Sequence, residues 1–156
     1  MSRRKINKKK KIEGDAIYNS TLIIQLINKI MKDGKKTLSE KIVYTTLKKI
    51  QETKNQDPME IVKKCIENLT PKVELKARRV GGATYQIPIE ITEKRGKSIA
   101  IQILIKCARN RNEKNIVSKL QNEILDAYNN IGNSIKKKEE IHKMAEANKA
   151  FTVLKL

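Results

Sequence analysis

The sequence predicts a mainly α-helical single domain of about six helices, with a two-stranded β-hairpin between the third and fourth helices and a basic N-terminal tail. Apolar residues recur at helical spacing before residue 70 and after residue 98. Between these regions, at about residues 72–91, the apolar period becomes two. We therefore assign residues 1–14 to a basic tail and 15–156 to one helical domain, because a chain of 156 residues suits one core.

Three helices are predicted before the hairpin. The first begins after Ser20, a capping residue, and ends before Gly34. The second covers about residues 37–53, and the third begins at Asp57–Pro58 and ends at Thr70–Pro71. The side chains expected in the core are Leu22, Ile23, Leu26, Ile27 and Ile30, then Leu38, Ile42, Val43, Leu47 and Ile50, then Ile61, Val62, Cys65, Ile66 and Leu69.

The hairpin is predicted to turn at Gly81–Gly82, between two arms of alternating polarity. Its apolar positions are Val73, Leu75 and Ala77 on one arm and Ile87, Ile89 and Ile91 on the other. Pro88 has no N–H to donate, which restricts it to an edge. Because a two-stranded ribbon is marginal alone, we expect its base to pack on the helices and its tip to project.

Three helices follow the hairpin. The fourth, at about residues 98–110, is apolar almost all round, so we expect it at the centre. The fifth begins near Ile116 and ends before Gly132. The last, at residues 134–151, carries only a narrow apolar stripe, so we expect it at the periphery with a polar face available to a partner.

The net charge of +18 indicates a polyanionic partner. The first twelve residues hold seven of the 35 basic residues and no acidic one, so the rest of the chain still has 28 basic against 17 acidic residues. A basic tail on a basic body favours nucleic acid. A membrane is the weaker alternative, because no apolar run approaches the roughly 20 residues of a spanning helix. Nor does any helix pair a basic face with the set of Trp or Phe anchors expected of an interfacial segment, since the chain has no Trp and a single Phe.

The sequence contains no recognisable catalytic, cofactor or metal site, and we expect no enzyme. His142 is the only histidine, and Glu139 and Glu146 at helical spacing from it are expected to form surface ion pairs. The stretch Gly96–Ser98 is similar to the end of a phosphate-binding loop. The full pattern of such a loop requires a second glycine at position 91, where this chain has Ile91. We expect His142 to have a structural or RNA-surface role.

Four further residues that could carry chemistry are interpreted as non-catalytic. Glu123 and Asp126 are expected on solvated helix faces. Cys65 and Cys107 are far apart and belong to no CxxC, and each stands at an apolar helical position. We therefore expect two buried free thiols, which suit a reducing compartment.

The low aromatic content argues against RNA binding by stacking of bases on aromatic side chains. Readers of single strands commonly stack bases on aromatic rings, whereas this chain has four Tyr, one Phe and no Trp. Phosphate contact and recognition of RNA shape remain. Arg78 and Arg79 stand beside the glycine corner, where backbone and guanidinium groups can approach a phosphate together.

Three stretches carry a resemblance to a known family: "ARRVGGATYQIPIEI" at 77–91, "DGKK" at 33–36 and "KKKEEIHKMAEANKAF" at 136–151. They are similar to the seventh protein of the bacterial- and plastid-type small ribosomal subunit, over nearly the whole chain. The resemblance implies binding to the 3′ major domain of small-subunit rRNA and an early role in organising the subunit head. It further implies a place near the mRNA path and the tRNA exit site, beside other ribosomal proteins and not as a homo-oligomer.

The resemblance also implies which cations bind RNA. They are Arg3, Arg4, Lys5, Lys8, Lys9, Lys10 and Lys11 in the tail, then Lys35, Lys36, Lys76, Arg78, Arg79, Lys94, Arg95, Arg109 and Arg111, and in the last helix Lys136, Lys137, Lys138, Lys143 and Lys149. The chain departs from the family at Gln102–Ile103, where an Arg-Trp pair is common, and in its end "TVLKL", which lacks the usual aromatic residue and arginine.

The stretches "MSRRK" and "GDAIYNS" are more similar to plastid members than to bacterial ones. The 28 Lys against 7 Arg, with 23 Ile and 13 Asn, indicate an AT-rich genome. We therefore predict a plastid ribosome, in a chloroplast or a reduced non-photosynthetic plastid, with a bacterial cytoplasm as the alternative. Two other functions remain open, a helical DNA-binding or architectural regulator and an RNA-modifying enzyme.

Overall fold

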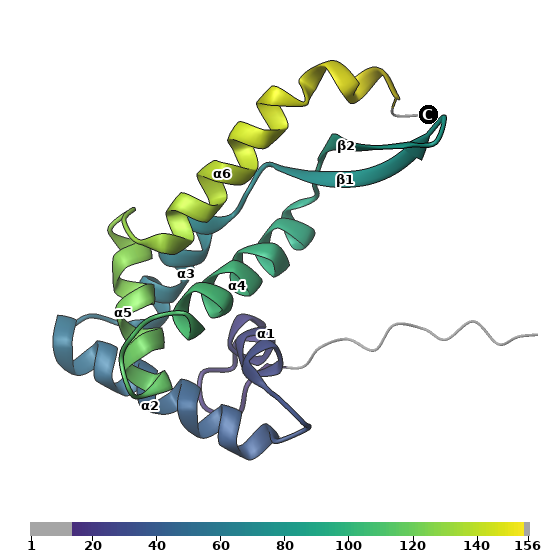
Figure 1. The fold of residues 1–156 in the computed structure, drawn as a ribbon. Coiled ribbons are helices and arrows are strands. Elements are labelled where there is room, and N and C mark those ends of the chain that lie inside the picture. The colour runs from purple at the N-terminus through teal and green to yellow at the C-terminus, as the bar shows by residue number, and fades with distance from the viewer. Residues whose placement is uncertain (1–13, 155–156) are drawn as a thin grey trace, which may run out of the picture.

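The computed structural model describes residues 14–154 (Figure 1). Three helices, a β-hairpin and three helices follow one another, which confirms the predicted fold class, and a short 3₁₀ helix comes after them. Residues 1–13 of the predicted tail lie outside the described part. The elements are α1 (Thr21–Ile30), α2 (Lys36–Lys54), α3 (Pro58–Leu69), β1 (Val73–Val80), β2 (Ala83–Glu90), α4 (Glu93–Arg109), α5 (Ile116–Tyr128), α6 (Asn133–Ala147) and η1 (Lys149–Leu154).

Helix α4 lies at the centre, as its composition predicts. It packs against α1, α3, α5 and α6, and Ala100, Ile101 and Leu104 are at most 1% exposed. The helix begins at Glu93, about five residues earlier than predicted. Its extra first turn contains an ion pair between Glu93 and Lys97, four residues apart.

Gly96 has a packing role in this first turn of α4. A Cβ added there would lie 2.8 Å from the side chain of Thr70 and 3.3 Å from the carbonyl oxygen of Pro71. The glycine therefore allows α4 to approach the segment that joins α3 to β1. This contact explains the residue without a phosphate-binding loop.

Of the two predicted N-terminal caps, one forms a capping hydrogen bond and the other does not. Asp57 caps α3, and its side chain accepts a hydrogen bond from the Met59 N–H at 2.9 Å. Ser20 occupies the N-cap of α1 but makes no side-chain capping bond. The segment before α1 is held instead by Asp15, which accepts a hydrogen bond from the hydroxyl of Tyr44 at 2.5 Å.

The prediction that Leu38 faces the core is wrong. Val43, Leu47 and Ile50 of α2 are at most 1% exposed, whereas Leu38 in its first turn is 53% exposed. Leu38 lies at the mouth of a groove that no other described element fills. Helical spacing placed it on the correct side of α2, but the first turn extends beyond the core.

The hairpin has the predicted two-residue turn. Gly81 and Gly82 have φ angles of +57° and +92°, which glycine adopts without strain. The register pairs Leu75 with Pro88 and Lys76 with Ile87. Paired residues share a face, so the apolar positions of the two strands lie on opposite faces of the ribbon. Neither face is uniformly apolar.

The hairpin is supported well beyond its base. Helix α6 and η1 run along it, with α6 packed on β1 and η1 on β2 (Figure 1). The rings of Tyr85 and Phe151 have centroids 5.1 Å apart. Ile87 and Pro88 are buried. We call β1, β2, α6 and η1 together the arm, and its far end carries the glycine turn.

Candidate nucleic-acid interface

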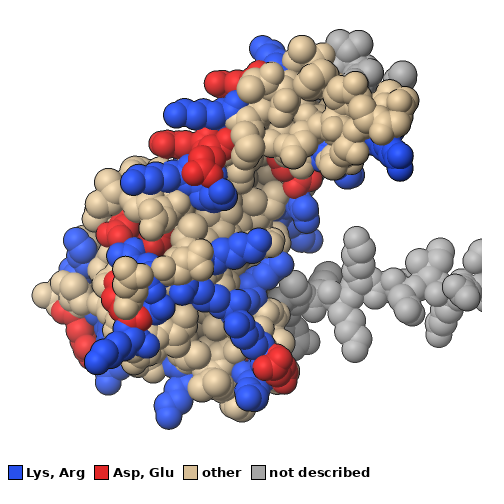
Figure 2. All heavy atoms as spheres, in the orientation of Figure 1, with Lys and Arg blue, Asp and Glu red and all other residues tan. Residues whose placement is uncertain are grey.

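Lysine and arginine side chains are spread over the visible face of the helical body and along the edges of the arm, with acidic residues in small groups between them (Figure 2). The predicted binding cations of the described region fall into four places. These are the hairpin, the turn between α1 and α2, the two ends of α4, and α6 with η1. The seven cations of the tail lie outside the described residues.

The hairpin carries an exposed cluster of three cations, Lys76, Arg78 and Arg79. Arg78 pairs with Tyr85 and Arg79 with Thr84, so these neighbouring arginines belong to opposite faces of the ribbon. From residue 75 to residue 89 the chain contains no acidic residue. The tip therefore presents positive charge on both of its faces.

The turn between α1 and α2 forms a second positive corner. Asp33 and Gly34 have φ angles of 52° and 72°, and the Lys35 N–H donates to the Lys32 carbonyl at 3.0 Å. Lys35 is the N-cap residue of α2 and makes no side-chain capping bond. Lys36 follows it, and the first turn of α2 contains no acidic residue. Cations at a helix N-terminus are unfavourable because the helix dipole is already positive there. An anion at this corner would stabilise it.

At the start of α4, Lys94 is exposed while Arg95 already has a partner. The Arg95 Nε donates to a carboxylate oxygen of Glu74 at 3.1 Å, and this pair joins α4 to β1. The Arg95 side chain is still 61% exposed. Such an exposed pair contributes little stability, so a phosphate can compete for the guanidinium.

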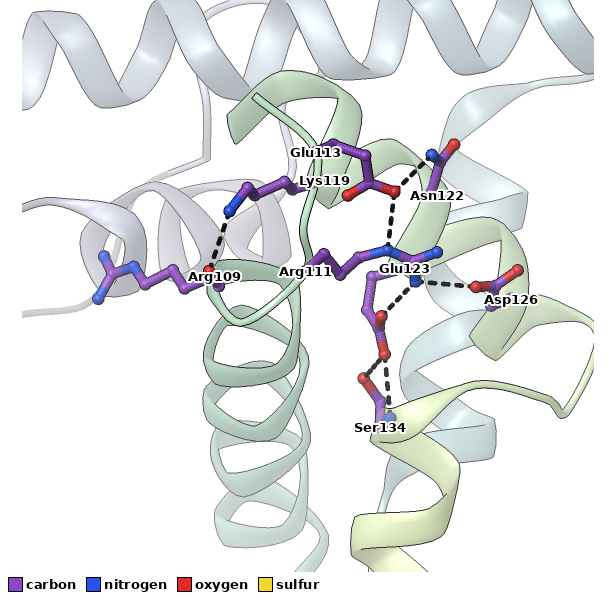
Figure 3. A network of polar contacts seen from close by, with 8 residues as sticks. All are labelled: Arg109, Arg111, Glu113, Lys119, Asn122, Glu123, Asp126 and Ser134. Carbon is purple, nitrogen blue, oxygen red and sulfur yellow. Dashed lines mark hydrogen bonds and ion pairs between the residues drawn. The ribbon is translucent and has the colours of Figure 1, made fainter. Parts of the chain in front are cut away.

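Arg109 at the end of α4 and Arg111 in the loop that follows have roles inside the protein. An Nη2 of Arg109 donates to the Ile30 carbonyl at 2.8 Å, which ties α4 to the end of α1. Arg111 contacts Glu113, Glu123 and Asp126 at 3.1, 2.5 and 2.8 Å (Figure 3). Burial alone would lower the pKa of Arg111, but the carboxylates outweigh it and raise that pKa above its ordinary value.

The expectation that Glu123 is solvated is wrong. This side chain is fully buried, and it joins Arg111 to the start of α6 (Figure 3). One carboxylate oxygen accepts from Arg111, and the other accepts from the Ser134 hydroxyl and from the Ser134 N–H, the latter at 2.9 Å. Asp126 is 32% exposed and pairs with the same guanidinium, so it is not simply solvated either.

The sequence contained a signal for Glu123 that the expectation missed. Glu123 lies three residues after Leu120 and four before Ala127, both of which are buried in α5. This spacing puts a carboxylate on the core-facing stripe, where a charge requires a partner. Nothing in the local sequence identifies that partner as Arg111, since Arg111 comes from the loop before α5.

The cations of α6 and η1 are divided between exposed and bonded groups. Lys136, Lys143 and Lys149 are exposed. Lys137 is exposed as well and pairs with Glu140 at 2.6 Å, and that hydrogen bond raises the pKa of Lys137. Lys138 donates to the Asn68 carbonyl at 2.6 Å, so it fastens α6 to the end of α3.

Three further residues singled out from the sequence are His142, Cys65 and Cys107. The His142 Nε2 accepts a hydrogen bond from the Lys72 N–H at 3.3 Å, which links α6 to the segment before β1. Cys65 is buried, and burial raises the pKa of its thiol to about 12. Cys107 is only partly buried, in contrast to the prediction. Across residues 14–154, no helix is long and apolar enough to cross a membrane.

Comparison with known proteins finds relatives that match nearly the whole chain. The model of the family "Ribosomal protein S7p/S5e" matches residues 2–149. The chain is 53% identical to small ribosomal subunit protein uS7c of Euglena gracilis over 99% of both chains, and 45% identical to uS7c of Nephroselmis olivacea over 100% of both. It is 52% identical to small ribosomal subunit protein uS7 of Microcystis aeruginosa over 97% of both chains.

Proposed function

Since the chain belongs to the ribosomal protein S7p/S5e family, we propose that this structural component of the small ribosomal subunit binds the 3′ major domain of small-subunit rRNA and helps organise the subunit head. The observation that supports this most is the hairpin tip. There Lys76, Arg78 and Arg79 are exposed on both faces of a ribbon that carries no acidic residue over residues 75–89.

The proposed mechanism is phosphate neutralisation by a supported arm. Because α6 and η1 pack along the hairpin, the tip is held away from the helical body before RNA arrives. Ordering the tip on binding therefore costs less than it would for a flexible loop. Each guanidinium can bind a phosphate through two parallel hydrogen bonds.

The positive corner at Lys35 and Lys36 supplies a second anchor on the helical body. Exposed Lys94, Arg95, Lys136, Lys137, Lys143 and Lys149 add phosphate contacts, as do the seven cations of the tail. We assign Arg109, Arg111 and Lys138 mainly to holding the protein together, because each donates to a protein oxygen at 3.1 Å or less.

We propose that the protein lies near the mRNA path and the tRNA exit site, with other small-subunit proteins beside it and no homo-oligomer. This placement follows the family resemblance. A protein that acts in this way stabilises one RNA fold without turnover.

We also propose that the protein works in a plastid ribosome. Relatives named uS7c and bacterial relatives named uS7 are comparably similar, so the lysine-, isoleucine- and asparagine-rich composition supports this choice. Mapping the gene tests it. A gene on a nuclear chromosome without an upstream targeting exon would refute synthesis inside the plastid.

The decisive experiment measures binding of the full chain to a transcript of the 3′ major domain across a salt series. Duplex DNA of equal length is the competitor. With roughly 6–10 phosphate contacts, affinity should fall by about 10³–10⁵ between 50 and 200 mM salt, with the RNA preferred throughout. The double variant Arg78→Ala, Arg79→Ala should bind more weakly and show a shallower salt slope.

The matched control is Lys48→Ala, Lys63→Ala, which removes the same charge from exposed positions on α2 and α3. It should bind the transcript as the unmodified chain does. Equal affinity for RNA and DNA, with no difference between the two double variants, would refute specific rRNA binding. That result would favour a general polycation such as an architectural DNA-binding protein.

A further inference from the structure

An apolar groove lies between the beginning of α2, the end of α4 and the beginning of α5. Its volume is about 500 Å³. Leu38, Ile42 and Ile116 line it, and none of these three is fully buried. Leu38 is 53% exposed, although helical spacing assigns it to the core. A large apolar side chain left in solvent at a concave site is typical of a surface that something covers.

Three cations surround this apolar groove. Lys32 and Lys35 lie at the two ends of the tight turn through Asp33 and Gly34, because the Lys35 N–H bonds to the Lys32 carbonyl at 3.0 Å. Arg109 lines the groove from α4, and its bond to the Ile30 carbonyl at 2.8 Å limits its movement. Asp33 is the one acidic residue among the lining residues. The groove therefore combines an apolar lining with a net positive surround.

We propose that this groove receives the base of one unstacked nucleotide of the bound rRNA. This inference rests on the proposed function. A nucleotide that leaves its stack presents an apolar ring face beside an anionic phosphate, and the groove presents apolar side chains beside lysines. The volume falls within the range of about 300–1,000 Å³ typical of small-ligand sites. Proteins commonly recognise RNA through such splayed-out bases.

The positive charge around the groove favours RNA over a protein segment as its occupant. A protein segment would have to place an acidic residue next to its apolar anchor to match Lys32, Lys35 and Arg109. RNA carries an anionic phosphate beside every base. Lys36, which follows Lys35 and is exposed, extends the positive surface in the direction along which the RNA backbone would continue.

The test separates apolar contact from charge contact with three single variants of the full chain. Leu38→Gln removes the apolar contact at constant charge. Ile131→Gln is its matched control, because Ile131 is 56% exposed and lies between α5 and α6, away from the groove. Lys35→Gln removes one charge. Each variant is titrated with the 3′ major domain transcript across the same salt series, and circular dichroism checks its folding.

Leu38→Gln should weaken binding about 5- to 30-fold with an unchanged salt slope, since the lost contact is not ionic. Ile131→Gln should bind as the unmodified chain does. Lys35→Gln should reduce the salt slope by about 0.7–0.9. Chemical probing of the bases should show one unpaired nucleotide that the unmodified protein protects and Leu38→Gln leaves reactive.

The outcomes distinguish this inference from the proposed function. If the unmodified chain does not prefer the transcript at all, the proposed function fails and the inference fails with it. If the chain binds but Leu38→Gln binds equally well and protects the same bases, only the nucleotide site is refuted. A loss in Leu38→Gln that appears only after other small-subunit proteins are added would also refute it, because a protein would then be the occupant.

Discussion

Replacing Glu123 by glutamine should destabilise the protein more than replacing any other single acidic residue of the described region. Glu123 is fully buried and accepts from Arg111, from the Ser134 N–H and from the Ser134 hydroxyl. Glutamine keeps the side-chain volume, but its NH₂ group then faces one of these donors and cannot accept a hydrogen bond from it. Removing one partner of a buried ion pair costs about 3–5 kcal/mol. We expect the lower end, because Arg111 retains Asp126 and Glu113.

The assay is urea unfolding at neutral pH. With an m value of about 2 kcal/mol/M, a loss of about 3 kcal/mol lowers the midpoint by about 1.5 M. Asp126→Asn is the matched control, since it removes a carboxylate from the same guanidinium at a position that is 32% exposed. It should cost about 1 kcal/mol or less.

A double-mutant cycle of Glu123→Gln with Arg111→Met isolates the ion pair itself, because the two side chains are in direct contact. The coupling energy should exceed about 1.5 kcal/mol. A loss below about 1 kcal/mol for Glu123→Gln, or additive single effects, would show that the network does not hold α5 and α6 together.

Three further changes have specific expected outcomes. Gly81→Ala should lower the free energy of unfolding by about 1 kcal/mol, because φ is +57° at this position. Gly81→Asn should lower it less, because asparagine tolerates this angle, and equal losses for the two variants would point to a steric cause. Ile103→Trp should raise stability by about 0.5–2 kcal/mol by filling the groove between α4, α6 and β1, and a lower thermal midpoint would show overpacking. Burial raises the pKa of Asp15, but hydrogen bonds from Tyr44 and from the N–H groups of Tyr18 and Ile17 outweigh it and hold that pKa below 3.8. The stabilisation should thus be fully present well above the ordinary pKa and be lost progressively as pH falls from there through the lowered pKa. Asp15→Asn should therefore destabilise the protein in urea unfolding at pH 7, and the deficit should shrink steadily as the pH is lowered below 3.8; a deficit that does not change with pH would refute this.

Local rules were sufficient for most elements of the fold. The spacing of Ile23, Leu26 and Ile27 predicts the buried face of α1, and Asp57 before Pro58 predicts the cap of α3. Gly81–Gly82 predicts the hairpin turn, because only residues that tolerate positive φ fit a two-residue loop of this kind. These features depend on neighbours within a few positions of the chain.

The features that sequence reasoning missed depend on contacts between distant residues. Leu38 is exposed because no residue in the described part of the chain covers the first turn of α2, and no local pattern encodes this. The burial of Glu123 is possible only because Arg111 arrives from another segment. Leu75 and Ile87 lie on opposite faces of the hairpin because of the register of its two strands, which the length of the turn sets. Of the candidate binding cations, exposure could be predicted for those on the hairpin but not for Arg111.

The contact between Tyr85 and Phe151 makes the order of synthesis matter for the arm. The second of these residues is added 66 positions after the first. At about 5–20 residues per second, the hairpin exists for roughly 3–13 s before its support has been translated. A chain that stops before η1 therefore contains every hairpin cation but lacks the element that packs on β2. The full support of the hairpin is therefore available only to chains whose translation has passed η1.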